Sequence, residues 1–255
     1  MGRKSQHEII SNAIMYTYPC GNVDILCSSD RIFIPEGYED AGEWGRKGPI
    51  PQKRAKGKKA EGDDALRSMR RARSKLRRLA LANEFQYFVT LTLDPDKIDR
   101  YDGAAVTKAL NTWCDNMVRR HGLRYILVPE QHKDGAFHFH GFMAGDGLSL
   151  ADSGVEWDGR PVYNLPQWTL GFTTAQELYG EYSAAVAYCC KYIGKQQGQR
   201  PLGRWYYSGG GLKEPTKEYL IMDYRELQQQ FPKESIELDI PGSKLLVIHT
   251  KTEGM

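Results

Sequence analysis

The sequence has no apolar segment that is long enough to cross a membrane. No run approaches the ~20 consecutive apolar residues that a membrane-spanning helix needs. The first residues also lack an apolar signal core followed by a small-residue cleavage site. The sequence therefore predicts a protein that works in the cytoplasm, without a membrane partner.

Cysteine is scarce as well, with five residues scattered along the 255 residues of the chain. An odd and scattered set of cysteines favours reduced thiols over a disulfide framework. The gap between Cys20 and Cys27 does not match the spacings that are common in zinc sites. These observations argue against a disulfide-rich domain and against a zinc-binding N-terminus.

The net charge of +3 is small, but the basic residues are unevenly distributed. Residues 46–78 contain 14 basic and three acidic residues, which gives this segment a net charge of +11. Such a segment is typical of a region that binds a polyanion, although a solvated arm has the same composition. The candidates for contact with nucleic-acid phosphates are Arg70, Arg71, Arg73 and Lys75.

Hydrophobic patterning predicts an α+β fold. We expect strands at 85–93, 124–130, 137–143 and 204–208, a strand pair at 236–240 and 245–250, and helices at 64–83, 104–121 and 180–194. Residues 144–168 have no clear period and are expected to be irregular. The order of these elements indicates a central antiparallel sheet with helices on one face.

Two histidines stand two residues apart in the third predicted strand. Because side chains alternate across a strand, His138 and His140 point to one face, where they can chelate a divalent ion. Glu130 on the preceding strand joins them if a three-residue loop, 133–135, pairs it with His138. Gly135 then occupies the position in such loops that favours a left-handed residue. A two-residue turn remains the alternative, and it would place Glu130 on the wrong face.

Two tyrosines and two lysines follow helical spacing in the segment 180–194 and just beyond it. Tyr188, Lys191, Tyr192 and Lys195 form one stripe of a helix. A free phenol ionises near pH ~10, so a nucleophilic tyrosine needs a neighbour that favours attack, and Lys191 suits that role. Tyr188 lies further from the buried face and is the predicted nucleophile. Tyr192 is either a second nucleophile or a packed aromatic, and Lys195 is a candidate for DNA contact.

The ordered set of motifs resembles the HUH endonuclease superfamily, and within it the replication initiators of small phages and plasmids. The resemblance covers about residues 85–210 and rests on FVTLTL at 88–93, HFHGF at 138–142 and YCCKYIGK at 188–195. The last motif is similar to the Y-x-x-K-Y pattern of initiators that have two tyrosines. Together with the linker composition and the strand pair near the C-terminus, this resemblance predicts an N-terminal extension with a basic linker (1–62), an HUH nuclease domain (63–230) and a C-terminal β-hairpin extension (231–255).

The resemblance implies an RRM-like or ferredoxin-like palm that nicks a single-stranded DNA origin and becomes linked to its new 5′ end. In the family's pattern His138, His140 and Glu130 bind Mg²⁺ or Mn²⁺, Tyr188 is the nucleophile with Lys191 beside it, and Tyr192 is the second tyrosine. The sequence has no G-x-x-x-x-G-K-[ST] motif. We therefore expect a separate helicase, supplied by the host.

Two other functions fit parts of the pattern. A related transposase or relaxase would use the same nicking chemistry on a different DNA target. A non-catalytic RNA- or DNA-binding module on an RRM-like sheet would bind bases without forming a covalent adduct. Trp205, Tyr206 and Tyr207 are candidates for base stacking, although a strand packed into the core explains them nearly as well.

Overall fold

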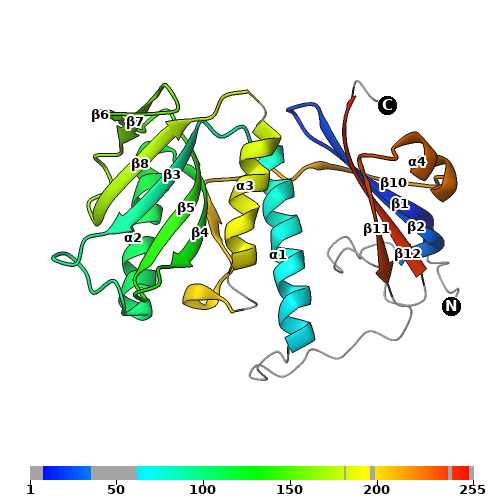
Figure 1. Ribbon diagram of the computed structural model, residues 1–255, viewed down its shortest axis with the longest axis horizontal. Helices are drawn as coiled ribbons and strands as arrows, with labels where there is room; N and C mark the ends of the chain where they lie inside the picture. Colours follow the sequence, from blue (N-terminus) through cyan, green and yellow to red (C-terminus); the bar gives the residue numbers. More distant parts are fainter. Residues whose placement is uncertain (1–7, 36–61, 181, 196–198, 241–242, 253–255) are drawn as a thin grey trace, which may run out of the picture. The chain divides into compact units, whose positions relative to one another are not determined.

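The computed structural model describes residues 8–35, 62–180, 182–195, 199–240 and 243–252. The chain divides into two compact units. The central unit is Lys59–Glu214, and the terminal unit combines Met1–Lys58 with Pro215–Met255. Each unit combines an antiparallel sheet with at least one helix, which confirms the predicted α+β class (Figure 1). Among the described helices, none is long and apolar enough to span a membrane.

The sheet of the central unit has seven strands, and every neighbouring pair is antiparallel. Their order across the sheet is β6-β7-β8-β3-β5-β4-β9. The bounds are Tyr87–Leu93 (β3), Arg124–Gln131 (β4), Phe137–Ala144 (β5), Ala151–Trp157 (β6), Arg160–Asn164 (β7), Gly171–Glu177 (β8) and Tyr207–Gly209 (β9). Three of the strands predicted from sequence, β3, β4 and β5, therefore lie next to one another in this sheet.

The prediction that residues 144–168 are irregular is wrong, because this segment contains β6 and β7. These strands form a hairpin whose turn residues, Asp158 and Gly159, both have positive φ. The pairing shifts register between Asp152 and Val155. This irregularity breaks the alternation of apolar and polar residues from which strands are recognised in a sequence.

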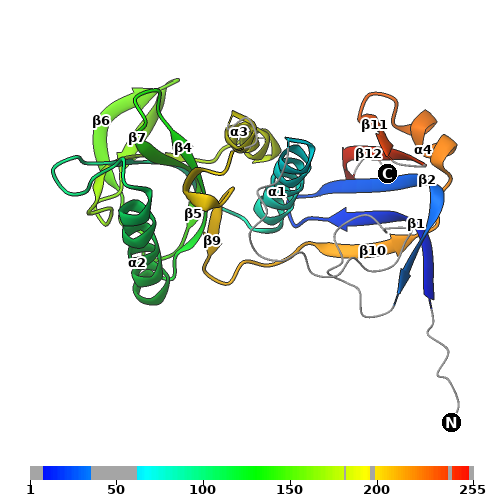
Figure 2. The ribbon, with the colours of Figure 1, turned by 90° about the horizontal axis from the view of Figure 1, so that it is seen from below.

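Helices cover both faces of the central sheet, whereas the sequence predicted helices on one face only. The long helices are α1 (Gly62–Ala82), α2 (Gly103–His121) and α3 (Tyr182–Lys195), and a short 3-10 turn, η1, follows at Pro201–Gly203. Leu91 of β3 and Phe139 of β5 pack with Leu110 of α2 in one core cluster. His140 points to the opposite face, where α3 packs on it, so the sheet lies between α2 and α3 (Figure 2).

A glycine in the middle of β5 lets two strands approach closely beside the two histidines. A Cβ atom on Gly141 would overlap the carbonyl oxygen of Ile126 and would lie 2.9 Å from the Cα atom of Leu127 on β4. We expect Gly141→Ala to lower the free energy of unfolding by about 3 kcal/mol, because the central strands must separate to admit the methyl group. Gly194→Ala is the control, since a Cβ there meets nothing within 4 Å. Chemical denaturation of both variants checks this, and equal stabilities would contradict it.

The terminal unit is a five-stranded antiparallel sheet that draws its strands from both ends of the chain. The strand order is β10-β1-β2-β12-β11. The bounds are Glu8–Thr17 (β1), Asn22–Pro35 (β2), Thr216–Leu220 (β10), Ser235–Ile240 (β11) and Ser243–Lys251 (β12), with helix α4 at Tyr224–Gln230. Ile25, Leu246 and Ile248 of the sheet pack with Leu227 of α4.

The predicted C-terminal hairpin is confirmed as β11 and β12, but the two ends of the chain do not form the separate extensions, 1–62 and 231–255, that were drawn from the sequence. Strand β2 pairs with β12, so the two ends form one sheet, and β10 adds a strand that was assigned to the central domain. Pairing between strands so far apart in sequence leaves no local pattern, and a linear division of the chain cannot represent it.

Candidate metal and tyrosine site

The hairpin of β4 and β5 brings the three predicted ligands to one face of the sheet. His132 donates its backbone N–H to the Ala136 carbonyl at 2.9 Å, which closes a three-residue loop. Gly135 in that loop has a φ of 93°, in the left-handed region. Glu130 pairs with His138, so the predicted three-residue register is confirmed and the two-residue alternative is wrong.

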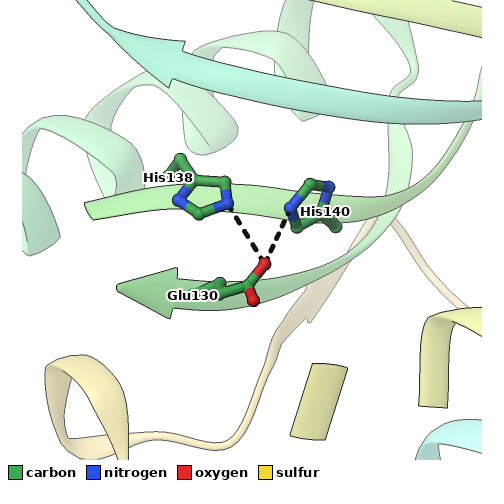
Figure 3. A group of neighbouring side chains, drawn as sticks. All are labelled: Glu130, His138 and His140. Atoms are coloured by element: carbon green, nitrogen blue, oxygen red, sulfur yellow. Dashed lines mark hydrogen bonds and ion pairs between the residues drawn. The ribbon is translucent and has the colours of Figure 1, made fainter. Parts of the chain in front are cut away.

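Glu130, His138 and His140 form a compact cluster of candidate metal ligands (Figure 3). One carboxylate oxygen of Glu130, Oε2, lies 3.2 Å from His138 Nε2 and 3.0 Å from His140 Nε2. The ligand atoms of the three residues all lie within 4.8 Å of one another. One carboxylate and two imidazoles, converging from two strands, are a donor set that can hold a divalent cation.

Burial favours the neutral form of both imidazoles. The pKa of His140 falls to about 4, first because of burial and then because His138 lies beside it. The pKa of His138 is lowered by burial and then by the neighbouring His132. A metal ligand must be a neutral imidazole, so this environment holds both histidines in the state that coordinates.

Outer contacts orient the two rings. Thr90 on β3 places its hydroxyl oxygen 3.1 Å from His140 Nδ1, which leaves Nε2 for the cluster. The ring of His132 stacks on that of His138 with centroids 3.7 Å apart. His138 Nδ1 is buried without a hydrogen-bond partner among the described protein groups. The residues therefore fit a bound cation. The role of Thr90 was not predicted from the sequence, in which only its place in the strand 85–93 indicated that it could lie near the histidines.

Lys195 reaches the cluster from the last turn of α3. Its Nζ atom lies 3.1 Å from Oε1 of Glu130, the carboxylate oxygen that does not face the histidines. The same ammonium lies 4.4 Å from the centroid of the Tyr192 ring. Lys195 was predicted to contact DNA. The structure places its ammonium against a candidate metal ligand, with the side chain 57% exposed, and the DNA contact stays a prediction.

The two tyrosines of α3 occupy different environments. Tyr188 is 50% exposed, whereas Tyr192 is 6% exposed. The Tyr192 ring stacks on His140 with centroids 4.0 Å apart, and its hydroxyl donates to the Tyr188 hydroxyl at 2.9 Å. Tyr188 meets the edge of Phe88 on β3, with centroids 5.8 Å apart. The buried Tyr192 therefore lies between the ligand cluster and the exposed Tyr188.

Lys191 and the predicted DNA-binding residues face solvent. Lys191 is exposed, and its Nζ atom lies 5.8 Å from the centroid of the Tyr188 ring. On α1, which lies beside α3 (Figure 1), four exposed basic residues are available to a polyanion. These are Arg70, Arg71, Arg73 and Lys75.

The aromatic residues predicted to stack on bases do not form an open platform. Trp205 and Tyr207 are 8% and 3% exposed, and Trp205 donates its ring N–H to Ser68 of α1 at 3.1 Å. The alternative that this segment packs into the core is therefore correct for both residues. Tyr206 is half-buried, and burial is the main reason that its pKa rises to about 12.

An exposed aromatic that the sequence did not reveal lies on the same face as the histidines. Phe172 of β8 is 65% exposed and pairs with Thr92 of β3, which in turn pairs with His138 of β5. Since neighbouring strands lie ~4.8 Å apart, Phe172 is about 10 Å from His138 across the sheet. The sequence did not indicate that Phe172 lies on this face, because β8 was not predicted as a strand.

Comparison with known proteins identifies a similarity over the segment that carries this site. Residues 86–197 match the model of the family described as Replication-associated protein ORF2/G2P. The match spans less than half of the chain but includes every residue from Phe88 to Lys195. No curated protein and no solved structure matches the chain significantly. The similarity is consistent with a replication initiator and supports a role in DNA replication.

Proposed function

We propose that this protein is an endonuclease of the HUH type that nicks a single-stranded origin and rejoins it, and so initiates rolling-circle replication. One observation carries the proposal. A half-exposed tyrosine stands near a cluster of one glutamate and two histidines, within a segment that matches a replication-associated family. A protein that only binds nucleic acid has no need of this combination.

In this proposal Tyr188 is the nucleophile. Its phenolic oxygen attacks a phosphorus atom of the origin strand, and the bond from phosphorus to the 3′ oxygen breaks. The upstream strand leaves with a free 3′-hydroxyl that can prime synthesis. The new 5′ end stays joined to Tyr188 through a phosphodiester, which conserves the energy of the bond for the later joining step.

Glu130, His138 and His140 would hold the metal that the reaction needs, and we propose Mg²⁺ or Mn²⁺. When bound, such an ion polarises the scissile phosphate and makes its phosphorus a better electrophile. Lys195 holds the outer oxygen of Glu130, which leaves a single oxygen of that carboxylate for the cluster. The ammonium of Lys191 lies beside Tyr188 and can neutralise charge on the phosphate during attack.

We further propose that the exposed basic residues of α1 bind the phosphate backbone of the origin DNA. These are Arg70, Arg71, Arg73 and Lys75. Lysine and arginine contacts to phosphate do not read sequence, but they supply most of the affinity at low salt. Phe172, which is exposed on the same face of the sheet as the histidines, offers a surface on which an unpaired base can stack.

The double substitution Arg70→Gln with Arg71→Gln is expected to weaken binding of single-stranded DNA about tenfold at moderate salt. Removing two phosphate contacts should also reduce the magnitude of the negative slope of log K against log salt by about 1.4. Fluorescence anisotropy at several salt concentrations measures both quantities. Arg119→Gln with Arg120→Gln is the matched control, because it removes two exposed charges from the end of α2 on the other face of the sheet. Equal losses in both pairs would show that only net charge matters.

A denaturing gel tests the proposed function as a whole. The wild-type protein is mixed with labelled single-stranded oligonucleotides from its own replicon, with Mn²⁺ or with a chelator. We expect a labelled protein species that survives SDS, appears only with the metal and disappears after proteolysis. Tight binding of the same oligonucleotides without any such species would instead favour a non-catalytic binding module.

A further inference from the structure

The two tyrosine hydroxyls of α3 are in direct contact, and the contact has a direction. Tyr192 donates its hydroxyl hydrogen to the oxygen of Tyr188 at 2.9 Å. The rings meet at a right angle with centroids 5.5 Å apart, as expected for residues four positions apart on one helix face. The oxygen proposed to attack phosphorus therefore accepts a hydrogen bond from the neighbouring tyrosine.

The two tyrosines also differ in burial. Tyr192 is 6% exposed, and its hydroxyl hydrogen is used in the bond to Tyr188. Tyr188 is 50% exposed, so a phosphate can reach its oxygen from solvent. Of the two hydroxyls, the one on Tyr192 is thus the donor, and the one on Tyr188 is accessible to the DNA.

The Tyr192 ring is held from two sides. One face stacks on His140, with centroids 4.0 Å apart and an angle of 18° between the rings. The ammonium of Lys195 lies 4.4 Å from its centroid. His140 and Glu130, the partner of Lys195, are both candidate metal ligands, so the ligand cluster itself fixes the position of this hydroxyl.

We propose that Tyr192 is a hydrogen-bond donor to the attacking oxygen of Tyr188 and not the nucleophile of a second cleavage. The proposal rests on the proposed function of Tyr188. To attack phosphorus itself, Tyr192 would have to leave its stack on His140 and expose a hydroxyl that is now buried. Its contribution is to stabilise the charge on the Tyr188 oxygen and to hold that oxygen beside the cluster.

The proposed step balances in atoms and charge. Tyr188 loses its hydroxyl proton to solvent, and its oxygen, still accepting the hydrogen bond from Tyr192, forms a bond to phosphorus. The bond from phosphorus to the 3′ oxygen breaks with its electron pair on that oxygen, which takes up a proton from water. Tyr192 keeps its own proton throughout, so it is not consumed in the reaction.

Single-turnover cleavage of a saturating oligonucleotide tests this role. Tyr192→Phe keeps the ring on His140 but removes the hydroxyl, so we expect a rate roughly 10- to 100-fold lower. The affinities for DNA and for Mn²⁺ should stay within about twofold of the wild type, which a general loosening of the site would not allow. Tyr182→Phe is the matched control on α3, because it removes a hydroxyl bonded to the Ala80 and Asn83 carbonyls, away from the cluster. It should cleave at the wild-type rate.

The outcomes separate this proposal from the proposed function. A wild-type adduct together with an unchanged cleavage rate in Tyr192→Phe would overturn the donor role alone. An adduct in Tyr188→Phe, mapped to Tyr192 by mass spectrometry, would also overturn it, since Tyr192 would then be a nucleophile. If the wild-type protein formed no adduct on any strand of its replicon, the proposed function would fail, and this role would fail with it.

Discussion

Replacement of Tyr188 by phenylalanine is expected to abolish the covalent adduct between the protein and its origin strand. Phenylalanine keeps the ring and its contact with Phe88 but has no oxygen to bond to phosphorus. Because the buried Tyr192 is proposed as a donor, we do not expect it to substitute for Tyr188. The adduct should fall below detection on a denaturing gel, which corresponds to a loss of at least about a thousandfold.

The same variant should keep the properties that do not depend on the oxygen. Its affinities for Mn²⁺ and for single-stranded DNA should remain close to those of the wild type, since Tyr188 is half-exposed. Lys191→Met serves as a graded comparison, because it removes the nearby ammonium while leaving the nucleophile in place. We expect it to form the adduct slowly. Undiminished adduct in Tyr188→Phe would contradict the assignment of the nucleophile.

The ligand cluster was predictable from sequence because the information that fixes it is local. Alternation along one strand puts His138 and His140 on the same face, and the loop glycine, Gly135, sets the register of Glu130 on the next strand. All of these residues lie in a single hairpin. No knowledge of the remaining chain was needed to bring the carboxylate and the imidazoles together.

The environment of the tyrosines was not predictable in the same way. A helical wheel places Tyr188 and Tyr192 near one another, but it does not show that Tyr192 stacks on His140. That contact depends on how α3 crosses the sheet, and the crossing is set by packing between distant segments. Lys195 illustrates the same limit, because its charge suggested DNA contact while its neighbour in the structure is Glu130.

Part of the fold beyond the central strands was hidden for a related reason, although the hairpin of β11 and β12 was predicted. Strand β8 supplies the exposed Phe172, yet its sequence, GFTTAQE, contains few of the apolar residues that mark a strand. Its position is fixed by full pairing with β3 and not by its own composition. The five-stranded sheet of the terminal unit likewise depends on pairing between β2 and β12, which no local pattern reveals.

Loss of the Glu130 charge is expected to remove most of the affinity for metal. Glu130→Gln keeps the size of the side chain but replaces an anionic oxygen that faces both histidines at 3.0 and 3.2 Å with a neutral one. We expect the dissociation constant for Mn²⁺, measured by isothermal titration calorimetry, to rise by about a hundredfold or more. Adduct formation should fall in parallel at low Mn²⁺ and recover in part at high Mn²⁺.

Two further variants distinguish a ligand from a general electrostatic effect. Thr90→Val removes the hydroxyl that meets His140 Nδ1, so it should weaken Mn²⁺ binding by about tenfold, less than the loss of the carboxylate. Glu177→Gln removes one negative charge from the same sheet, but Glu177 lies outside the cluster and should leave the affinity unchanged. The loss of Mn²⁺ affinity should therefore decrease in the order Glu130→Gln, Thr90→Val, Glu177→Gln, as each side chain lies further from the proposed ion. Equal effects in the first and last variants would mean that net charge attracts the metal and that Glu130 does not coordinate it.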